Sequence, residues 1–251
     1  MHKPGFFKHL LMVIGATIFW IGTILLTALI LVPMWCTFVL PVRWRYKVAN
    51  LWNTTVVWWL KQTCGLGFRV EGAENIPKDT YVVISNHQST WETFAFFFIF
   101  HPTTYVIKQE LNRVPIFGWA ITPLHFIGIN RSGGKQALKQ VLKQGKRCQS
   151  YRLNITVFPE GTRTAAGVDR AYKKGGAMLA RSLKAPVVPV AHNAGVFWPR
   201  HSYVKHPGVI TVRIGKSIDT NGLSVDEINT RAKNWINAQV IEMNKSTAIV
   251  D

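Results

Sequence analysis

The sequence predicts an α/β protein whose mainly parallel sheet is covered by helices and preceded by an N-terminal apolar membrane helix and an amphipathic interfacial helix. Three observations support this prediction. Residues 9–42 contain no Asp, Glu, Lys or Arg, a basic and tryptophan-rich stretch follows, and from residue 66 onward short apolar runs alternate with helical patterns. We therefore expect membrane-anchoring helices in residues 1–65 and an α/β domain in residues 66–251.

The first element is an apolar helix long enough to cross a membrane. Its densest part, Leu10–Val32, has 23 residues, which as a helix would extend about 34 Å against a hydrocarbon core of roughly 30 Å. A cleaved signal peptide has a shorter apolar run of about 7–15 residues, so we expect the helix to be retained. Pro33 should break or kink it. Nearly balanced cations on its two sides leave open whether it spans the bilayer or enters one leaflet and returns.

The second element, residues 42–62, interleaves cations with tryptophans. Six of the ten tryptophans fall within the first 59 residues, and Arg43, Arg45 and Lys47 lie among them. Indole rings and cations together favour the headgroup layer of a membrane, which predicts an amphipathic helix lying in the interface. The alternative is an ordinary core helix with a basic outer face.

The remainder predicts a single domain in which strands alternate with helices. Continuous apolar strands are typical of a parallel sheet that is buried on both faces. We expect strands near residues 68–70, 81–85, 104–107, 126–129, 155–158, 187–191 and 210–214. We expect helices near residues 90–100, 116–122, 134–146, 175–183 and 225–243.

The charge balance indicates a polyanionic partner. The chain has 30 Lys+Arg against 12 Asp+Glu, a formal net charge of +18, and all 12 carboxylates lie from Glu71 onward. Such a charge suits either nucleic acid or a phosphate-bearing membrane surface. The apolar N-terminus and the lack of a nucleic-acid-binding motif favour the membrane. The 3 cysteines form no Cys-x-x-Cys pair, so neither a disulfide framework nor a metal site is expected.

The segment Tyr81–Glu92, YVVISNHQSTWE, carries the first candidate catalytic pair. If His87 lies on the loop after a strand and Glu92 in the first turn of the next helix, the carboxylate can fold back onto the imidazole. It would then fix the tautomer and stabilise imidazolium while the other ring nitrogen takes a proton. A purely structural interpretation competes, because Ser89-x-x-Glu92 is also a capping box.

Three further strand ends carry polar residues. Ile155–Arg163, ITVFPEGTR, places a tight turn and Arg163 after a buried strand, and an arginine fork suits a phosphate. Leu124–Arg131, LHFIGINR, delivers a second arginine, and Ala185–His192, APVVPVAH, contains two prolines. Ligands of open α/β sheets bind at the carboxyl ends of strands, so Arg131 and Arg163 are expected to converge. Alternatively, the Glu and Arg of the turn simply pair with each other.

Together these four segments resemble the glycerolipid acyltransferase family, the 1-acyl-sn-glycerol-3-phosphate acyltransferases in particular. Asn86–Glu92 is similar to the family's first block, His-x4-Asp, and Phe126–Arg131 to the second. Phe158–Arg163 matches the third, Phe-Pro-Glu-Gly-Thr-Arg, residue for residue, and Val188–Ala191 is similar to the fourth. The family usually has Asp where this chain has Glu92.

The resemblance implies transfer of a fatty acyl group from a thioester to the sn-2 hydroxyl of lysophosphatidic acid, giving phosphatidic acid for phospholipid biosynthesis. By resemblance His87 and Glu92 are catalytic, and the acceptor phosphate is bound by the set Arg131, Glu160, Gly161, Thr162 and Arg163. Acyl-CoA or acyl-acyl carrier protein is the expected co-substrate, with no cofactor. The alternatives are another acceptor (glycerol 3-phosphate, another lysophospholipid or a lyso-aminolipid) or, more remotely, a non-catalytic membrane-tethered binder of anionic lipid.

The basic middle of the chain suggests where phosphate-bearing partners attach. Residues 131–184 contain 13 Lys+Arg and 2 carboxylates, and Lys135, Lys139 and Lys143 recur on one face of a predicted helix. They form either a dock for anionic headgroups or an acidic donor, or a solvated helix face. We expect the protein on a membrane, the bacterial inner membrane, with its catalytic domain on the cytoplasmic face.

Overall fold

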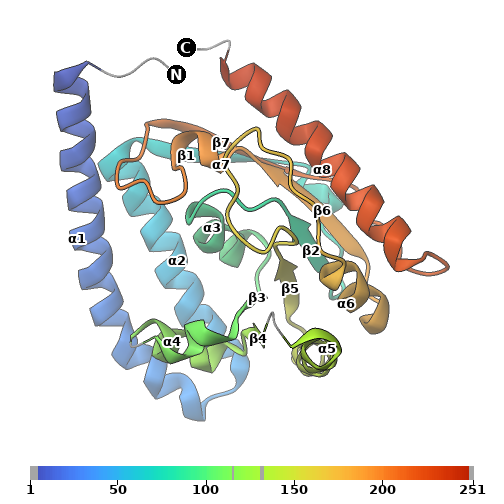
Figure 1. The fold of residues 1–251 in the computed structure, drawn as a ribbon. Helices are drawn as coiled ribbons and strands as arrows, with labels where there is room; N and C mark the ends of the chain where they lie inside the picture. Colours follow the sequence, from blue (N-terminus) through green and yellow to red (C-terminus); the bar gives the residue numbers. More distant parts are fainter. Residues whose placement is uncertain (1–4, 115, 131–132, 249–251) are drawn as a thin grey trace.

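A seven-stranded sheet organises the computed structural model, which describes residues 5–114, 116–130 and 133–248. Its spatial order is β1-β7-β6-β2-β5-β3-β4 (Figure 1). The strands are β1 (Leu66–Glu71), β2 (Val82–Ser85), β3 (Thr103–Lys108), β4 (Ile127–Ile129), β5 (Asn154–Val157), β6 (Val187–His192) and β7 (Gly208–Ile214). All neighbours are parallel except β6 and β7, which pair antiparallel. The predicted mainly parallel α/β fold is therefore confirmed.

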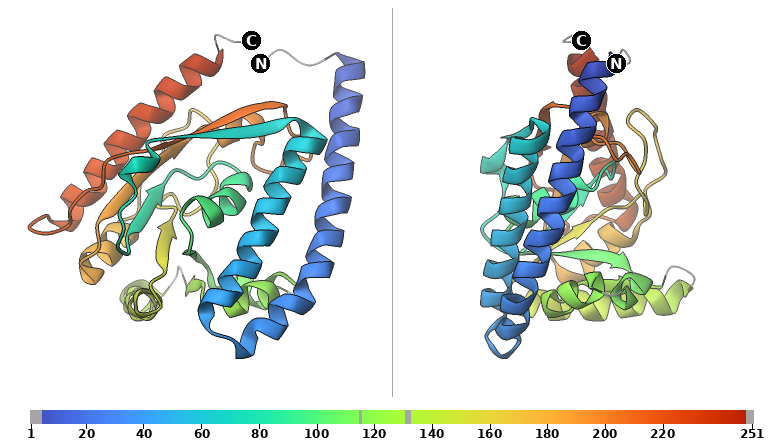
Figure 2. Two further views of the ribbon diagram at one scale, coloured as in Figure 1. Left: turned by 180° about the vertical axis from the view of Figure 1, so that it is seen from behind. Right: turned by 90° about the vertical axis from the view of Figure 1, so that its left-hand side faces the viewer.

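Two groups of helices cover the sheet on opposite faces (Figure 2). On one face, α2 (Val42–Cys64) packs against α3 (Trp91–Ile99). On the other, α6 (Gly175–Leu183) packs between α5 (Gly134–Ser150) and α8 (Val225–Ala248). The central strands β2, β5 and β6 are buried along their whole length, in keeping with their mainly apolar sequences. The short helices α4 (Phe117–Ile121) and α7 (Ala194–Phe197) complete the fold.

Helix α1 (Phe6–Cys36) contains the long uncharged stretch and lies outside the sheet layers, beside α2 (Figure 1). It is long and apolar enough to cross a membrane, with a mean hydropathy of 2.3 over its most apolar stretch, of which only 22 % is buried. Pro33 does not break the helix, which continues to Cys36. The fixed backbone angle of proline is compatible with a helix, although one N–H bond is lost and the ring crowds the carbonyl of the fourth residue before it. Of the expected break or kink, the break is therefore wrong and the kink stays a prediction.

The α1–α2 pair is closely packed because small residues lie where the helices cross. A Cβ atom added to Gly22 would overlap the indole of Trp59, and one added to Gly15 would overlap the carbonyl oxygen of Thr63. These two glycines are two helical turns apart on the same face of α1. Any larger side chain at either position would push the two helices apart.

Helix α2 has the burial pattern of a core helix with a basic outer face, and its place in a membrane interface stays a prediction. One face is buried against α3 and the sheet and includes Tyr46, Val56 and Leu60. The other face exposes Trp44 and Trp58, together with Arg43 and Lys47 near its start. The helix is therefore part of the core on one side and keeps a basic, tryptophan-bearing outer surface on the other.

Candidate active site

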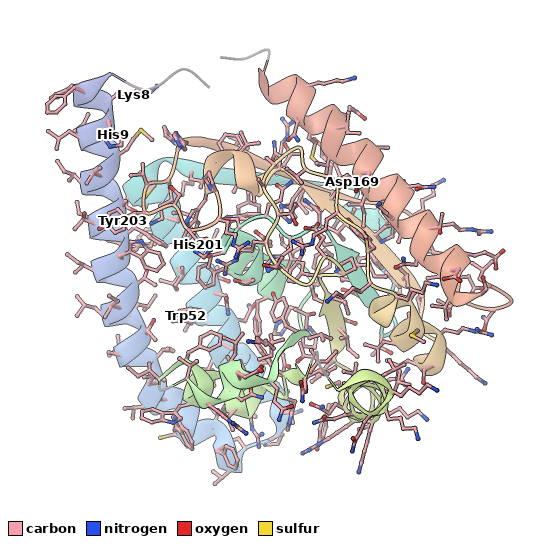
Figure 3. All side chains as sticks on the ribbon, viewed as in Figure 1. Lys8, His9, Trp52, Asp169, His201 and Tyr203 are labelled. Carbon is pink, nitrogen blue, oxygen red and sulfur yellow. The ribbon has the colours of Figure 1, made fainter. Side chains whose placement is uncertain are left out.

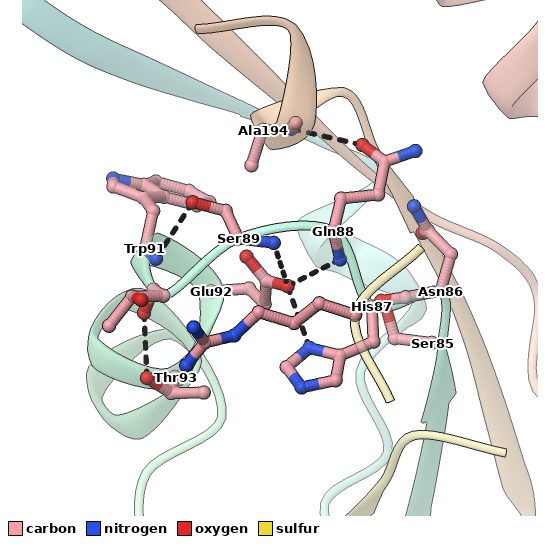
Figure 4. Close-up of polar contacts among 12 residues, drawn as sticks. Ser85, Asn86, His87, Gln88, Ser89, Trp91, Glu92, Thr93 and Ala194 are labelled. Atoms are coloured by element: carbon pink, nitrogen blue, oxygen red, sulfur yellow. Dashed lines mark hydrogen bonds and ion pairs between the residues drawn. The ribbon is translucent and has the colours of Figure 1, made fainter. Parts of the chain in front are cut away.

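His87 and Glu92 meet at the carboxyl end of β2 (Figure 4). The strand ends at Ser85, a polar loop follows, and Glu92 lies in the first turn of α3. The Nδ1 atom of His87 lies 2.8 Å from Oε1 of Glu92. An ionised carboxylate can only accept, so Nδ1 carries the proton and Nε2 has its lone pair free. Nε2 has no hydrogen-bond partner within the described part of the chain.

The same carboxylate oxygen also caps helix α3. Glu92 Oε1 accepts hydrogen bonds from the backbone N–H groups of Gln88 and Ser89, each at 2.8 Å. The Ser89 hydroxyl oxygen in turn accepts the N–H of Trp91 at 3.2 Å. The capping interpretation and the catalytic interpretation of Glu92 are therefore compatible. The cap fixes the carboxylate, and the fixed carboxylate orients the imidazole.

Glu92 is fully buried, and its surroundings favour the charged form. Burial by itself raises the pKa of this carboxyl, but the imidazoles of His192 and His87 and the Ser89 N–H outweigh it, so the pKa lies below its ordinary value. The second oxygen, Oε2, is buried and has no hydrogen-bond partner among the residues described. A carboxylate held in this way is a fixed negative charge beside His87.

His192, at the end of β6, is a site residue that the sequence motifs did not indicate. Its Nε2 lies 2.9 Å from the Asn86 carbonyl oxygen, and its Nδ1 accepts the Ala194 N–H at 3.2 Å. Nε2 therefore carries the proton and the ring is neutral, in keeping with the burial that lowers its pKa. Asn86 and His192 also exchange two hydrogen bonds between side chain and backbone, at 2.9 and 3.1 Å. The parallel pairing of β2 with β6 was the signal that would have placed this histidine at the site.

The loop after β5 makes three contacts with His87, one with its ring and two with its backbone. The Phe158 ring stacks on the imidazole with centroids 4.2 Å apart and planes 14° apart. Glu160 Oε1 accepts the His87 N–H at 3.0 Å, and the Thr164 N–H donates to the His87 carbonyl at 2.7 Å. The Thr164 hydroxyl donates to the other Glu160 oxygen. Burial raises the pKa of Glu160. Hydrogen bonds from the Thr164 hydroxyl and the His87 N–H offset part of this effect, and the pKa stays above its ordinary value.

The loop after β5 also contains three of the residues predicted to bind phosphate, Gly161, Thr162 and Arg163. Gly161 closes a turn, with φ of 73° and its N–H donating to the Phe158 carbonyl at 3.1 Å. Thr162 and Arg163 follow, half-buried, and Arg163 lines the same cavity as His87. Burial lowers the pKa of the Arg163 guanidinium, which stays cationic. Arg131 lies outside the described residues.

A largely apolar cavity of about 750 Å³ opens beside the pair. Its lining includes His87, Gly161 and Arg163. Its walls come from α1, α2, α3, α4 and the end of β3. Lys108, at the carboxyl end of β3, also lines it and was not predicted from the sequence. The volume lies within the range of roughly 300–1,000 Å³ that small-molecule sites occupy.

This geometry defines a class of chemistry. A histidine with one ring nitrogen held by a carboxylate and the other free is a general base. Neighbouring cations suit a phosphate, and an apolar cavity suits a hydrocarbon chain. A hydroxyl-bearing lipid phosphate meets all three requirements.

Comparison with known proteins agrees with this class. Residues 67–193 match the family model described as "Acyltransferase", and the chain belongs to this acyltransferase family. The predicted resemblance is thereby confirmed. The match begins in β1 and ends just after β6, so it includes His87, Glu92, Glu160, Arg163 and His192.

Individual relatives carry more specific names. A protein of Pseudomonas aeruginosa named 1-acyl-sn-glycerol-3-phosphate acyltransferase is 41 % identical over 209 residues, covering 82 % of this chain and 81 % of the relative. A Saccharomyces cerevisiae protein of the same name is 35 % identical over 181 residues, covering 69 % and 59 %. The crystal structure of the lysophosphatidic acid acyltransferase PlsC from Thermotoga maritima shares the fold, with a TM-score of 0.70, 23 % identity, and coverage of 90 % of this chain and 98 % of that one.

Proposed function

We propose that this acyltransferase transfers a fatty acyl group from an acyl thioester to the sn-2 hydroxyl of 1-acyl-sn-glycerol 3-phosphate, giving phosphatidic acid. The observation that carries the proposal is the His87–Glu92 pair, 2.8 Å apart, beside a largely apolar cavity that His87 and Arg163 both line. The names of the Pseudomonas and yeast relatives support the choice of acceptor.

The reaction follows from the two ring nitrogens of His87. Nε2 takes the proton of the acceptor hydroxyl as its oxygen attacks the thioester carbonyl carbon. The C–S bond then breaks, the ester C–O bond remains, and the imidazolium returns its proton to the departing thiolate. Glu92 stabilises the imidazolium through Nδ1 and keeps the ring from turning. General-base assistance of this kind contributes about 10²–10⁴ in rate.

The loop after β5 has two tasks in this scheme. Arg163, together with Arg131, Gly161 and Thr162, binds the acceptor phosphate, and a bidentate guanidinium is the strongest part of that contact. Glu160 acts differently within the same set, because its carboxylate holds the His87 backbone N–H and so positions the base. Lys108 adds a cation to the cavity that holds the substrate.

The apolar part of the cavity binds an acyl chain, and the membrane supplies it. One wall is formed by α1, the helix that is long and apolar enough to cross a membrane. An acceptor lipid then reaches His87 without leaving an apolar environment. We place the enzyme on the bacterial inner membrane with the sheet and its site on the cytoplasmic face, where acyl-CoA and acyl-acyl carrier protein are found.

Helix α5 offers a surface for the soluble acyl donor. Lys135, Lys139 and Lys143 are exposed on one face, whereas Ala137 and Val141 are buried on the other. A row of cations at this spacing suits the phosphates of CoA or the acidic surface of a carrier protein. We include docking of the donor at this face in the proposal.

One assay tests the proposed reaction. Purified full-length enzyme is mixed with radiolabelled acyl-CoA and, in parallel, with lysophosphatidic acid, glycerol 3-phosphate, a lysophospholipid bearing a headgroup, and a lyso-aminolipid. We expect labelled phosphatidic acid in the first reaction and little product in the others. Efficient labelling of another acceptor would replace lysophosphatidic acid in the proposal, and no acyl transfer to any acceptor would indicate a binding protein.

A further inference from the structure

A buried ammonium group lies between helix α1 and the domain. Lys205, in the loop between α7 and β7, is only 1 % exposed. Its Nζ lies close to the faces of four aromatic rings, at 4.7 Å from Phe19, 4.4 Å from Trp20, 4.8 Å from Trp198 and 5.4 Å from Tyr203. It donates one hydrogen bond, to the Tyr203 carbonyl at 2.8 Å, and has no carboxylate partner among the residues described.

This aromatic cage joins two parts of the chain that are far apart in sequence. Phe19 and Trp20 come from α1, whereas Trp198 and Tyr203 come from the loop before β7. Figure 3 shows Tyr203 beside α1. The rings also contact one another edge to face, with centroids 5.6 Å apart for Phe19 and Trp198 and 5.9 Å apart for Trp20 and Trp198. The Tyr203 hydroxyl adds a hydrogen bond of 2.9 Å to Thr17.

The charge in this cage contributes more than packing. An apolar side chain would fill the same space without the cost of removing an ammonium from water. A cation is attracted to the faces of aromatic rings, so it favours the arrangement in which the rings turn their faces toward it. An apolar contact has no such preference. Burial lowers the pKa of Lys205 to about 8, with the nearby Cys64 thiol acting the other way, so the group is charged at neutral pH.

Trp20 connects this cage to the substrate cavity. Its ring contacts the Lys205 ammonium and also lines the cavity that contains His87 and Arg163. Of the α1 residues in the cavity wall, Trp20 is nearest the N-terminus, and Met34 is nearest the C-terminus. The indole is therefore the bulky side chain at one end of the wall that α1 provides.

We propose that Lys205 is a positioning residue for the acyl cavity: its ammonium holds α1 against the domain and fixes Trp20 in the cavity wall, and this sets the acyl-chain lengths that the enzyme accepts. The inference rests on the proposed function, since it takes the cavity to bind an acyl chain. Lys205 lies beyond the region that matches the family model, which ends at residue 193.

The experiment compares acyl-CoA donors of increasing chain length, with lysophosphatidic acid as acceptor and full-length enzyme in phospholipid vesicles. We expect Lys205→Met to change the ratio of kcat/KM between long and short donors by about tenfold, the scale on which an apolar pocket discriminates chain length. The change should appear in KM more than in kcat. Trp20→Ala should give the same shift, and the double variant no more than either alone. Lys205→Arg, which keeps the cation, should retain the native profile.

Two further variants serve as a matched control and a substitute. Lys233→Met removes an ammonium that contacts a different ring, Tyr172, at 6.0 Å, and should leave the profile unchanged. Trp198→Phe weakens the cage while keeping the cation buried and should give a smaller shift, so it replaces Lys205→Met if that variant does not fold.

Ala49 distinguishes a failure of the cavity assignment from a failure of the Lys205 assignment. This residue is buried in α2 and lines the cavity, so Ala49→Phe should exclude the longest donors. If Ala49→Phe left the profile unchanged, the cavity would not bind the acyl chain and the proposed function would need revision. If Ala49→Phe shifted the profile while Lys205→Met and Trp198→Phe lowered activity equally with every donor, Lys205 would be purely structural and the inference would be overturned.

Discussion

Oε1 of Glu92 lies 2.8 Å from Nδ1 of His87 and accepts two backbone N–H groups of the same loop at the same distance. Three donors therefore converge on one buried oxygen. Because the two backbone donors do not depend on the imidazole, the carboxylate keeps its place when the ring is altered. This independence makes it possible to test the chemistry of the pair apart from its contribution to folding.

His87→Ala should abolish acyl transfer while the protein stays folded. The general base is lost, which costs about 10²–10⁴ in kcat, but the Glu92 cap and the pairing of β2 with its neighbours remain. Turnover with labelled acyl-CoA and the melting temperature of the same preparation are the measurements. Normal turnover would rule out His87 as the base.

Two substitutions of Glu92 should lower kcat to different extents, depending on whether they keep the negative charge. Glu92→Gln retains an oxygen for the backbone N–H groups but no longer stabilises imidazolium, so we expect kcat to fall about 10²-fold or more. Glu92→Asp keeps the charge with a shorter reach and should lose less, about tenfold. Both variants should bind substrate with nearly native KM. A Glu92→Gln enzyme as active as the Asp variant would show that the charge is unimportant.

Arg163→Ala should mainly weaken use of the phosphate-bearing acceptor. Loss of a charged hydrogen-bonding group costs about 1.5–3 kcal/mol, which corresponds to a rise in acceptor KM of about 10–150-fold with a smaller effect on donor KM. Arg200→Ala is a suitable control, because Arg200 donates to the Arg163 backbone carbonyl, at 3.3 Å, and does not line the cavity. An unchanged acceptor KM in Arg163→Ala would remove Arg163 from the phosphate site.

Reversal of the α5 lysines to Glu at positions 135, 139 and 143 should weaken the enzyme's interaction with its donor. All three are exposed, so the fold should tolerate the change. We expect donor KM to rise and its dependence on ionic strength to flatten, because steering by exposed charges is screened by salt. If donor KM and sedimentation with anionic vesicles were both unchanged, the lysines of α5 would form a solvated helix face that does not dock the donor.

The pKa of Glu92 predicts how stability depends on pH. Its pKa is lower in the folded protein than its ordinary value of 4.5, so the unfolded chain binds the proton more readily. The stabilisation is therefore complete above about pH 4.5 and is lost as pH falls through the lowered pKa. Unfolding by urea, followed by tryptophan fluorescence, should show a difference between the native protein and Glu92→Gln that shrinks with acidification. A difference that grew at low pH would contradict this sign.

The sequence predicted the sheet well because each strand is rich in Val, Ile or other apolar residues and is bounded by polar or turn residues. All seven expected strands overlap an observed one, and the five helices expected after residue 66 are likewise present. The antiparallel pairing of β6 with β7 was not predicted, since strand direction depends on a connection that no local pattern encodes. The four-residue helix α7 is too short to produce a periodic pattern.

The site was predictable where neighbours in sequence are neighbours in space. His87 and Glu92 lie five positions apart, on a loop and in the helix after it, so their contact was a possibility beside the capping interpretation, and the family resemblance favoured it. His192, Lys108 and Lys205 reach their places only through the packing of distant segments, and none carries a distinctive motif. Phe158 was identified as part of a motif, but its stacking on the His87 ring depends on β2 and β5 lying side by side.

The close crossing of α1 and α2 at Gly15 and Gly22 bears on how the protein can be handled. The helix that is long and apolar enough to cross a membrane also supplies a wall of the cavity beside His87 and two rings of the Lys205 cage. Trimming the first helix to obtain a water-soluble catalytic fragment would therefore open the reaction chamber along one side. Solubility and turnover are tied to the same segment, and detergents or lipid nanodiscs are the route to an active preparation.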